Sequence, residues 1–315
     1  MSVKDTNITR TTIADLLITN MMAGVVHPIL PGTSLNQLFQ VYADAKLGQG
    51  EYPSFGYYAI GDRGHTSSVV GDSDDIAVDL FKHDASDQAC WRHMAFVMRP
   101  EGNDLPPEER AKYAMRTYEE WNGVHYWCYY LKRLTVADLV ADTLRIRIIN
   151  GVESPEPYTY DERNLHPTRP SLPPDVAVTA SEDYYTISMP FSIVFSALDA
   201  QELRNAATIR YGNERRAIVS ELLMVGGVDR DVQTDGDGGT RISFKEAVCT
   251  QALTHLTTFH QMTISTHGFT VDMELGANEP INADDAGAAL NAQATALSRA
   301  RAMNVLSATT RPNNA

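Results

Sequence analysis

Three carboxylates in one stretch of the chain have the types and spacing of ligands for a calcium ion. Asp235 and Asp237 begin a glycine-rich segment, and Glu246 falls at the twelfth position, where an EF-hand loop places a bidentate carboxylate. The fifth position is Gly239 and the sixth is Thr240, whereas the motif needs an oxygen ligand and a glycine there. We therefore favour a solvated acidic hairpin loop, with a calcium site at Asp235, Asp237 and Glu246 as the alternative.

Other catalytic and ligand-binding motifs are missing from the sequence. Neither Gly61–Gly64 nor Gly226-Gly227 matches a dinucleotide- or phosphate-binding glycine pattern, and we interpret Gly61–Gly64 as a tight turn. The histidines and cysteines show no spacing typical of a zinc site. No nucleophile elbow (G-x-S-x-G) is present. We therefore predict no cofactor, no metal and no enzymatic activity.

Aromatic residues are dense between residues 113 and 130. They occupy odd and even positions on both sides of Asn122-Gly123, a pair typical of a type I′ turn, which predicts a β-hairpin with aromatic side chains on both faces. Three interpretations remain open: a platform that stacks sugars or bases, a hairpin buried against a neighbouring chain, and a central strand pair within one domain. The candidate interface residues here are Tyr126, Trp127, Tyr129 and Tyr130.

Composition limits the partners of the chain. Its 315 residues are 43% hydrophobic and 21% charged, as in a globular protein with room for two domains. The net charge of −14 argues against a nucleic-acid partner, because nucleic-acid-binding proteins need a basic face. No apolar run reaches the roughly eighteen residues of a membrane span. The first residues do not have the pattern of a signal peptide. Cys90, Cys128 and Cys249 are predicted to be free buried thiols of a chain folded in a reducing cytosol.

Capping residues and hydrophobic periodicity predict the elements of the first half. Thr12 with Asp15 resembles the start of a helix, Ser34 precedes a second short helix, and Pro106-Pro107 begin a third. In addition to the hairpin, strands are predicted at residues 55–60 and 143–150.

Strands and helices are predicted to alternate in the second half. Asp199 with Glu202 resembles a capping box and predicts a helix that ends at Gly212. Ser243 with Glu246 resembles a second capping box and predicts a helix through residue 259. The predicted strands are residues 184–195, 217–225 and 269–275. Long elements of both types without a regular βαβ order favour an α+β fold, with mixed, largely antiparallel sheets and a few short helices.

Proline and alanine mark the predicted domain boundaries. Prolines concentrate in residues 153–182, which we interpret as a segment connecting an N-terminal domain, 1–152, to a C-terminal domain, 183–280. Residues 281–315 are alanine-rich and contain no aromatic residue, so they are predicted to be a tail. Leu290 and Leu297 would share one side of a short helix there, which needs a partner surface to be stable, so both are candidate interface residues.

Several short segments occur in an order that is found elsewhere: Tyr57–His65, Phe96–Pro100, Leu105–Arg110, Asn122–Leu131, Ile209–Gly212 and Ile218–Leu222. Together they resemble virion structural proteins of large tailed bacteriophages, in the tail and baseplate group that includes the baseplate wedge proteins. The resemblance covers residues 50–280. It implies a role in assembly, with other virion subunits and copies of the same chain as partners, inside a virion assembled in the host cytoplasm. It implies no catalytic residues.

The sequence therefore predicts a non-enzymatic structural subunit of a phage tail baseplate. A component of the neck that connects head and tail is the alternative within the same class. The alternative from another class is a carbohydrate-binding or hydrolytic protein that uses the aromatic hairpin as a stacking platform, with an unidentified pair of acids.

Overall fold

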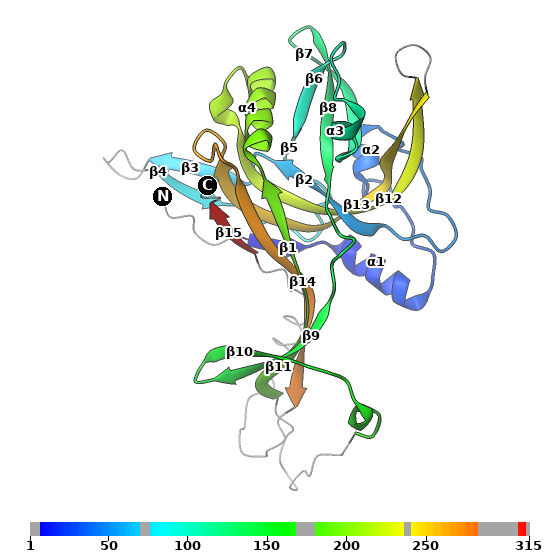
Figure 1. Ribbon diagram of the computed structural model, residues 1–315, viewed down its shortest axis with the longest axis vertical. Coiled ribbons are helices and arrows are strands. Elements are labelled where there is room, and N and C mark those ends of the chain that lie inside the picture. The colour runs from blue at the N-terminus through cyan, green and yellow to red at the C-terminus, as the bar shows by residue number, and fades with distance from the viewer. Residues whose placement is uncertain (1–6, 70–75, 168–179, 236–240, 283–307, 313–315) are drawn as a thin grey trace. The chain divides into compact units, whose positions relative to one another are not determined.

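The computed structural model describes residues 7–69, 76–167, 180–235, 241–282 and 308–312. Antiparallel sheets with a few short helices make up these residues, which confirms the predicted α+β class (Figure 1). The chain forms two units. Unit 1 comprises residues 1–136, 194–270 and 311–315, and unit 2 comprises residues 137–193 and 271–310. Each unit thus takes residues from both predicted halves, so the units do not coincide with the predicted domains 1–152 and 183–280.

Unit 1 is built on an eight-stranded sheet. In spatial order its central path is β1 (Asn7–Arg10), β13 (Arg241–Gln261), β12 (Ile218–Asp235), β2 (Ser54–Gly61), β8 (Val124–Arg133) and β6 (Val97–Pro100). Strand β5 (His93–Met94) pairs with β2, and β7 (Tyr113–Trp121) pairs with β8. A separate two-stranded sheet is formed by β3 (His65–Val69) and β4 (Ile76–Leu80).

The predicted aromatic hairpin is confirmed as β7 and β8. Trp121 pairs with Val124, so Asn122 and Gly123 alone form the turn. Their φ angles of 53° and 78° are the positive values that a type I′ turn requires, and asparagine and glycine adopt them at low cost.

The helix predicted through residues 244–259 is wrong, because this segment is strand β13. It pairs with β12 along most of its length, from Asp235 opposite Arg241 to Ile218 opposite Gln261. Both faces of the strand are covered, so its apolar residues do not alternate, and short apolar runs of this kind have no unambiguous period. The β-branched threonines of the segment favour a strand. Glu246 caps no helix and instead contacts Arg110.

Four α-helices accompany the sheet in the described part of unit 1: α1 (Thr12–Ala23), α2 (Leu35–Phe39), α3 (Pro107–Arg110) and α4 (Ala197–Tyr211). A short 3-10 helix, η2 (Glu214–Arg216), follows α4. The predicted end of α4 is confirmed, since Gly212 adopts a left-handed conformation with φ of 69°. Its N-cap is Ser196, paired with Asp199, one turn earlier than predicted. Helix α1 is capped by Thr11, and α2 by the predicted Ser34.

The core of unit 1 covers both faces of β2. Tyr57 belongs to a buried cluster with Leu35, Met115, Leu131 and Leu223. The next residue, Tyr58, points to the opposite face, where its ring packs edge-on against Phe96 and Phe195. The three cysteines are buried and free, as predicted. Within the described residues, no helix is long and apolar enough to cross a bilayer.

Unit 2 contains most of a five-stranded sheet in the order β10, β9, β11, β14, β15. The strands are β10 (Val152–Pro157), β9 (Asp142–Ile149), β11 (Ala180–Phe195), β14 (Phe269–Asn282) and β15 (Ala308–Pro312), and the 3-10 helix η1 spans Glu162–Leu165. The described part of the proline-rich segment belongs to this unit. Pro155 and Pro157 lie in β10, which is an edge strand and pairs with β9 on one side only. Proline has no backbone N–H, and an edge strand tolerates this because its outer side makes no hydrogen bonds to another strand.

Candidate functional site

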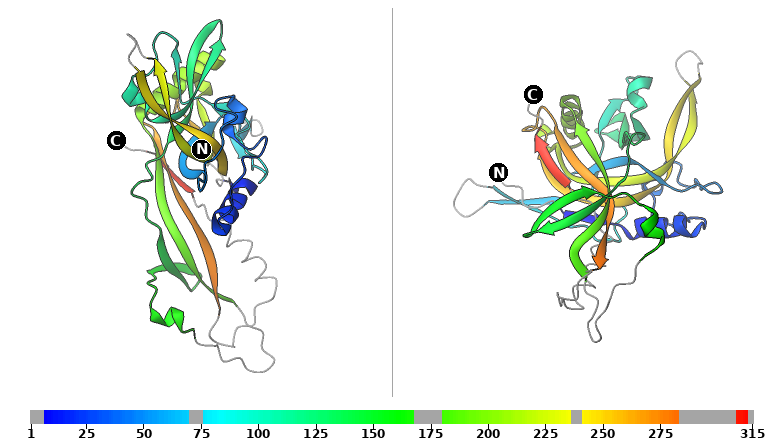
Figure 2. Two further views of the ribbon diagram at one scale, coloured as in Figure 1. Left: turned by 90° about the vertical axis from the view of Figure 1, so that its right-hand side faces the viewer. Right: turned by 60° about the horizontal axis from the view of Figure 1, so that its bottom comes forward.

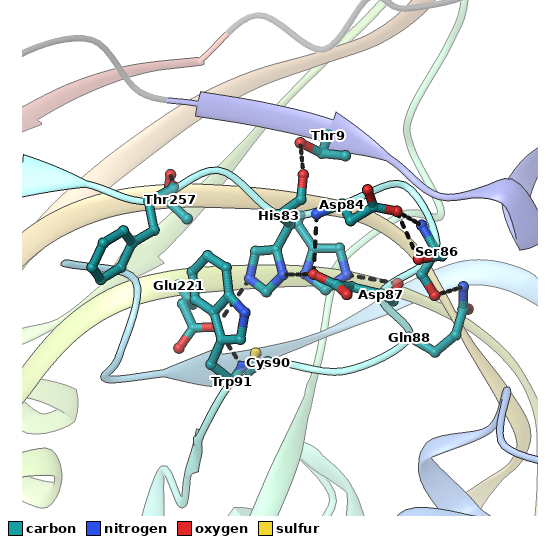
Figure 3. Close-up of polar contacts among 12 residues, drawn as sticks. Thr9, His83, Asp84, Ser86, Asp87, Gln88, Cys90, Trp91, Glu221 and Thr257 are labelled. Carbon is teal, nitrogen blue, oxygen red and sulfur yellow. Dashed lines mark hydrogen bonds and ion pairs between the residues drawn. The ribbon is translucent and has the colours of Figure 1, made fainter.

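Loop 81–92 joins β4 to β5 and lies across strands β1, β12 and β13 (Figure 3). Thr9 Oγ1 of β1 donates a hydrogen bond to the carbonyl oxygen of His83 at 3.1 Å. Thr257 Oγ1 of β13 donates to the carbonyl oxygen of Phe81 at 2.7 Å. Threonines on two neighbouring strands therefore hold the backbone of the loop against the sheet.

The imidazole of His83 is buried between two carboxylates. Its Nδ1 lies 2.8 Å from Asp87 Oδ2, and its Nε2 lies 3.1 Å from Glu221 Oε1. The ring is stacked between the rings of Trp91 and His255, with centroid distances of 3.7 and 3.9 Å. Both ring nitrogens therefore face a carboxylate oxygen, and a nitrogen that carries a proton donates a hydrogen bond to the carboxylate that it faces.

Glu221 of β12 is 0% exposed and accepts three hydrogen bonds. The backbone N–H of Arg63 donates to Oε2 at 3.0 Å, and that of Trp91 donates to Oε1 at 2.8 Å. The third donor is His83. A buried carboxylate is costly unless its oxygens are hydrogen-bonded, and here each of the two oxygens accepts a backbone N–H.

The Gly61–Gly64 segment makes room for this carboxylate. It connects β2 to β3, as expected of a turn. A methyl group at Gly61 would overlap the carboxylate of Glu221, and one at Gly64 would overlap the carbonyl oxygen of Ser220. The two glycines are therefore needed because the Gly61–Gly64 segment passes close to β12. The absence of a phosphate-binding glycine pattern gave no indication of this role.

Burial keeps two histidines near His83 neutral. Loss of hydration lowers the pKa of His93 to about 3 and that of His255 to about 4. Neutral imidazoles can bind metals, but in the described part of the chain no three His, Cys, Asp or Glu side chains converge into a metal site. We call the contacts among His83, Asp87, Glu221 and Trp91 the buried network. In this fold the buried network fixes loop 81–92 on the sheet and holds the ring of Trp91 over that of His83.

Two pockets lie beside the ion pair of Arg133 and Asp229. Arg133 Nη1 is 2.7 Å from Asp229 Oδ1, which also accepts a hydrogen bond from the Tyr57 hydroxyl at 2.6 Å. One pocket, of about 560 Å³, is lined by Tyr57 and Phe55, among others. The second, of about 420 Å³, is lined by α3 and residues 243–246 of β13. These volumes are in the range of small-molecule sites.

Arg110 and Glu246 are the buried charges of the second pocket. Arg110 Nη2 is 3.3 Å from Glu246 Oε1, and the guanidinium lies 3.4 Å over the ring of Phe244. Arg110 Nε and Glu246 Oε2 have no hydrogen-bond partner. In a side-on guanidinium–carboxylate pair these two atoms would form the second hydrogen bond. Burial raises the pKa of Glu246.

The alternative calcium set is not assembled in the described structure. Glu246 is a strand residue paired with Arg110, whereas the twelfth ligand of a calcium loop must be free to bind the cation. Asp235 is the last residue of β12, and Asp237 lies outside the described residues.

The predicted interface residues of the hairpin divide into two pairs. Tyr129 and Tyr130 are 1% and 4% exposed and belong to the core of unit 1, so they cannot contact a partner chain without unfolding. The Tyr129 hydroxyl donates to Asp104 at 2.6 Å, and the Tyr130 ring stacks on Phe39. Tyr126 and Trp127 are partly exposed. The predicted tail residues Leu290 and Leu297 lie outside the described residues.

Two aromatic rings of the hairpin, Trp127 and Tyr118, have stacking partners within the chain. The guanidinium of Arg116 lies 3.8 Å from the centre of the Trp127 ring. The Tyr118 ring stacks on His125 at 5.0 Å with an interplanar angle of 10°. A platform for sugars needs a ring with a free, flat face, and one face of each of these rings is occupied.

An exposed apolar surface lies on α1 and the residues that follow it. The inner face of α1 packs Ile13, Ala14 and Leu17 into the core. Its outer side and the next turn expose six apolar side chains, which we call the α1 apolar surface: Ile18 (44%), Met21 (51%), Met22 (86%), Val25 (48%), Val26 (71%) and Leu30 (40%). A surface helix normally has a polar outer face, and the outer side of α1 is polar at Thr12, Asp15 and Thr19 but apolar in its last turns. In Figure 2, left, α1 and α2 lie on the face turned to the viewer.

The sequence contains a signal for this surface that motif analysis missed. Residues 16–43 contain no Asp, Glu, Lys or Arg, although 21% of the whole chain is charged. A plot of charge along the chain would have identified this uncharged segment. Only the structure shows which of its apolar residues face outward.

Comparison with known proteins identifies a family without an assigned activity. Residues 1–289 match a family of unknown function, DUF7208. No curated protein and no solved structure matches the chain.

Proposed function

We propose that this chain, which belongs to the DUF7208 family of unknown function, is a structural subunit of a tailed-phage virion. In this proposal it acts through protein–protein contacts in the tail baseplate, with other virion subunits and copies of itself as partners, after assembly in the host cytoplasm. The neck that connects head and tail is the alternative position. The proposal assigns no catalytic residue, cofactor or metal to the chain.

The observation that carries this proposal is the α1 apolar surface. Soluble monomers rarely expose contiguous apolar patches larger than a few hundred Å², and larger ones mark interaction sites. Burying such a surface in an assembly stabilises the contact by about 25 cal/mol for each Å² removed from water. Met22, at 86% exposure, contributes little to the folded unit and gains most from a partner.

Two further features support the proposal. The segments between residues 50 and 280 resemble tail and baseplate proteins in their order, which is a resemblance of pattern and not of a site. The two pockets beside Arg133 and Asp229 contain charged side chains that are paired within the chain, as these two residues are with each other. An assembly subunit needs a fold held firmly in this way, because rigid surfaces lose less entropy when they bind.

The direct test is the protein content of phage particles. We would purify particles by density gradient from the lysate in which the chain is expressed, wash them in high salt, and quantify their proteins by mass spectrometry. We expect the chain at a constant ratio to the tail proteins in every preparation, with host ribosomal proteins as the control for contamination. A chain that is abundant in the lysate but removed with the ribosomal proteins contradicts the proposal.

A further inference from the structure

Four residues of the α1 apolar surface lie together over the last turns of α1 and its C-terminal turn. Ile18, Met21 and Met22 are spaced by three and four residues, so they lie next to one another on one side of α1. Gly24 ends the helix in a left-handed conformation, and the N–H of Val25 bonds to the carbonyl oxygen of Asn20 at 3.0 Å. This turn keeps Val25 close to the last turn of α1. The Tyr52 hydroxyl bonds to the carbonyl oxygen of Val25 and fixes it further.

Charge limits what can cover this surface. The α1 apolar surface lies within residues 16–43, which contain no charged residue, and Asp15 at its edge is paired with Arg10 at 2.8 Å. A charged partner would lose its hydration there without gaining a counter-charge. An anionic membrane surface would need Lys or Arg beside the apolar face, and the segment has none. The surface therefore fits an uncharged, apolar partner.

A second copy of the chain has such a surface. Two copies repel each other over most of their surfaces, because each carries a net charge of −14. The uncharged segment is a region where two copies can approach with few like charges in contact. A two-fold interface uses the same patch on both copies, and an uncharged apolar patch is complementary to itself.

The area of the surface is of the order that a contact between two chains needs. Its six residues are 40–86% exposed, so together they leave on the order of several hundred Å² open to solvent, against the roughly 800 Å² per partner of a standard interface. Exposed neighbours such as Thr19 and Pro28 add to this area. We infer that two copies of this chain associate about a two-fold axis through their α1 apolar surfaces. This inference rests on the proposed function and names the partner of one of its contact surfaces.

The test is the oligomeric state of the full chain and of two matched variants. Met22→Glu places a charge in the centre of the contact, whereas Leu198→Glu places one at a similarly exposed apolar position, 56%, in the first turn of α4. In sedimentation velocity we expect dimers for the wild type and for L198E. For M22E we expect a dissociation constant at least about 30-fold higher, as for a central interface residue. Circular dichroism of all three chains shows whether each is folded.

Cross-linking gives an independent measurement of the symmetry. The native cysteines are buried, so a short bismaleimide reacts with an introduced cysteine first. Met22→Cys should give cross-linked dimers, and Leu198→Cys should give none. A monomeric wild type, or dimers that M22E leaves intact, would overturn the inference. If particles contain a monomeric chain, the inference alone fails, whereas a dimer absent from particles means that the proposed virion function fails.

Discussion

Replacing Glu221 by alanine tests whether the buried network holds unit 1 together. The change removes the acceptor of three hydrogen bonds and leaves two backbone N–H groups, of Arg63 and Trp91, and the imidazole of His83 without it. Each donor left unpaired in a buried site costs about 1–3 kcal/mol. We therefore expect Glu221→Ala to lower the free energy of unfolding of unit 1 by about 4 kcal/mol.

Tryptophan fluorescence in urea measures this loss, because all three tryptophans, Trp91, Trp121 and Trp127, belong to unit 1. Glu221→Gln keeps one acceptor oxygen and should lose about half as much, which provides a folded variant if E221A unfolds. Glu120→Ala, at an exposed position of β7, is the control and should change little. A loss below about 1 kcal/mol for E221A, with loop 81–92 still protected from hydrogen exchange, would refute the reasoning.

Three further predictions concern single features of unit 1. Gly64→Ala should destabilise unit 1 by more than about 1 kcal/mol in the same urea assay, because its methyl group would overlap the carbonyl of Ser220; a neutral effect would show that the backbone can move apart. Burial lowers the pKa of His255 from 6.5 in the unfolded chain to about 4 in the folded chain. Between these values the unfolded chain binds a proton that the folded chain does not, so the free energy of unfolding falls as the pH drops from 6.5 to 4, by up to about 3 kcal/mol from this group. His255→Gln should remove that part of the slope, and an unchanged pH profile would contradict it. Arg110→Met should lower the free energy of unfolding of unit 1 strongly, because it leaves Glu246 buried without its partner. Adding Glu246→Leu should recover most of the lost stability, since a buried pair can be replaced by apolar residues, and additive losses of the two changes in urea unfolding would contradict a paired role.

Much of the fold could be predicted where local chemistry decides the structure. The Asn122-Gly123 turn requires positive φ angles that few other pairs adopt, and Gly212 ends α4 for the same reason. Strands β9 and β14 follow their period-two patterns at residues 143–150 and 269–275. In these segments the local sequence and the tertiary structure favour the same conformation.

Two of the errors, at β13 and at the hairpin, have a common physical cause, which is burial on both faces. Strand β13 is covered on both sides, so its residues lack the alternation that identifies a strand, and Ser243 with Glu246 imitates a capping box. The same burial places Tyr129 and Tyr130 in the core, although tyrosine is common at interfaces. Aromatic content alone could not separate a hairpin inside the unit from one at a contact.

The buried network was beyond prediction because its members are far apart in the sequence. His83 and Glu221 are separated by more than a hundred residues and meet only because β12 lies under loop 81–92. Single histidines and glutamates carry no spacing signal. The α1 apolar surface was predictable in part, because the uncharged segment is visible in the sequence, but the outward direction of Met22 depends on which face of α1 is packed.

The oxidation rate of Met22 in purified particles is the most direct test of an assembly role through the α1 apolar surface. Methionine thioethers react with dilute peroxide according to their exposure, and mass spectrometry follows each one separately. The account predicts that Met22, 86% exposed in the single chain, reacts in particles as slowly as Met224, which is 1% exposed. Oxidation of Met22 in particles at the rate of a freely exposed methionine would contradict the account.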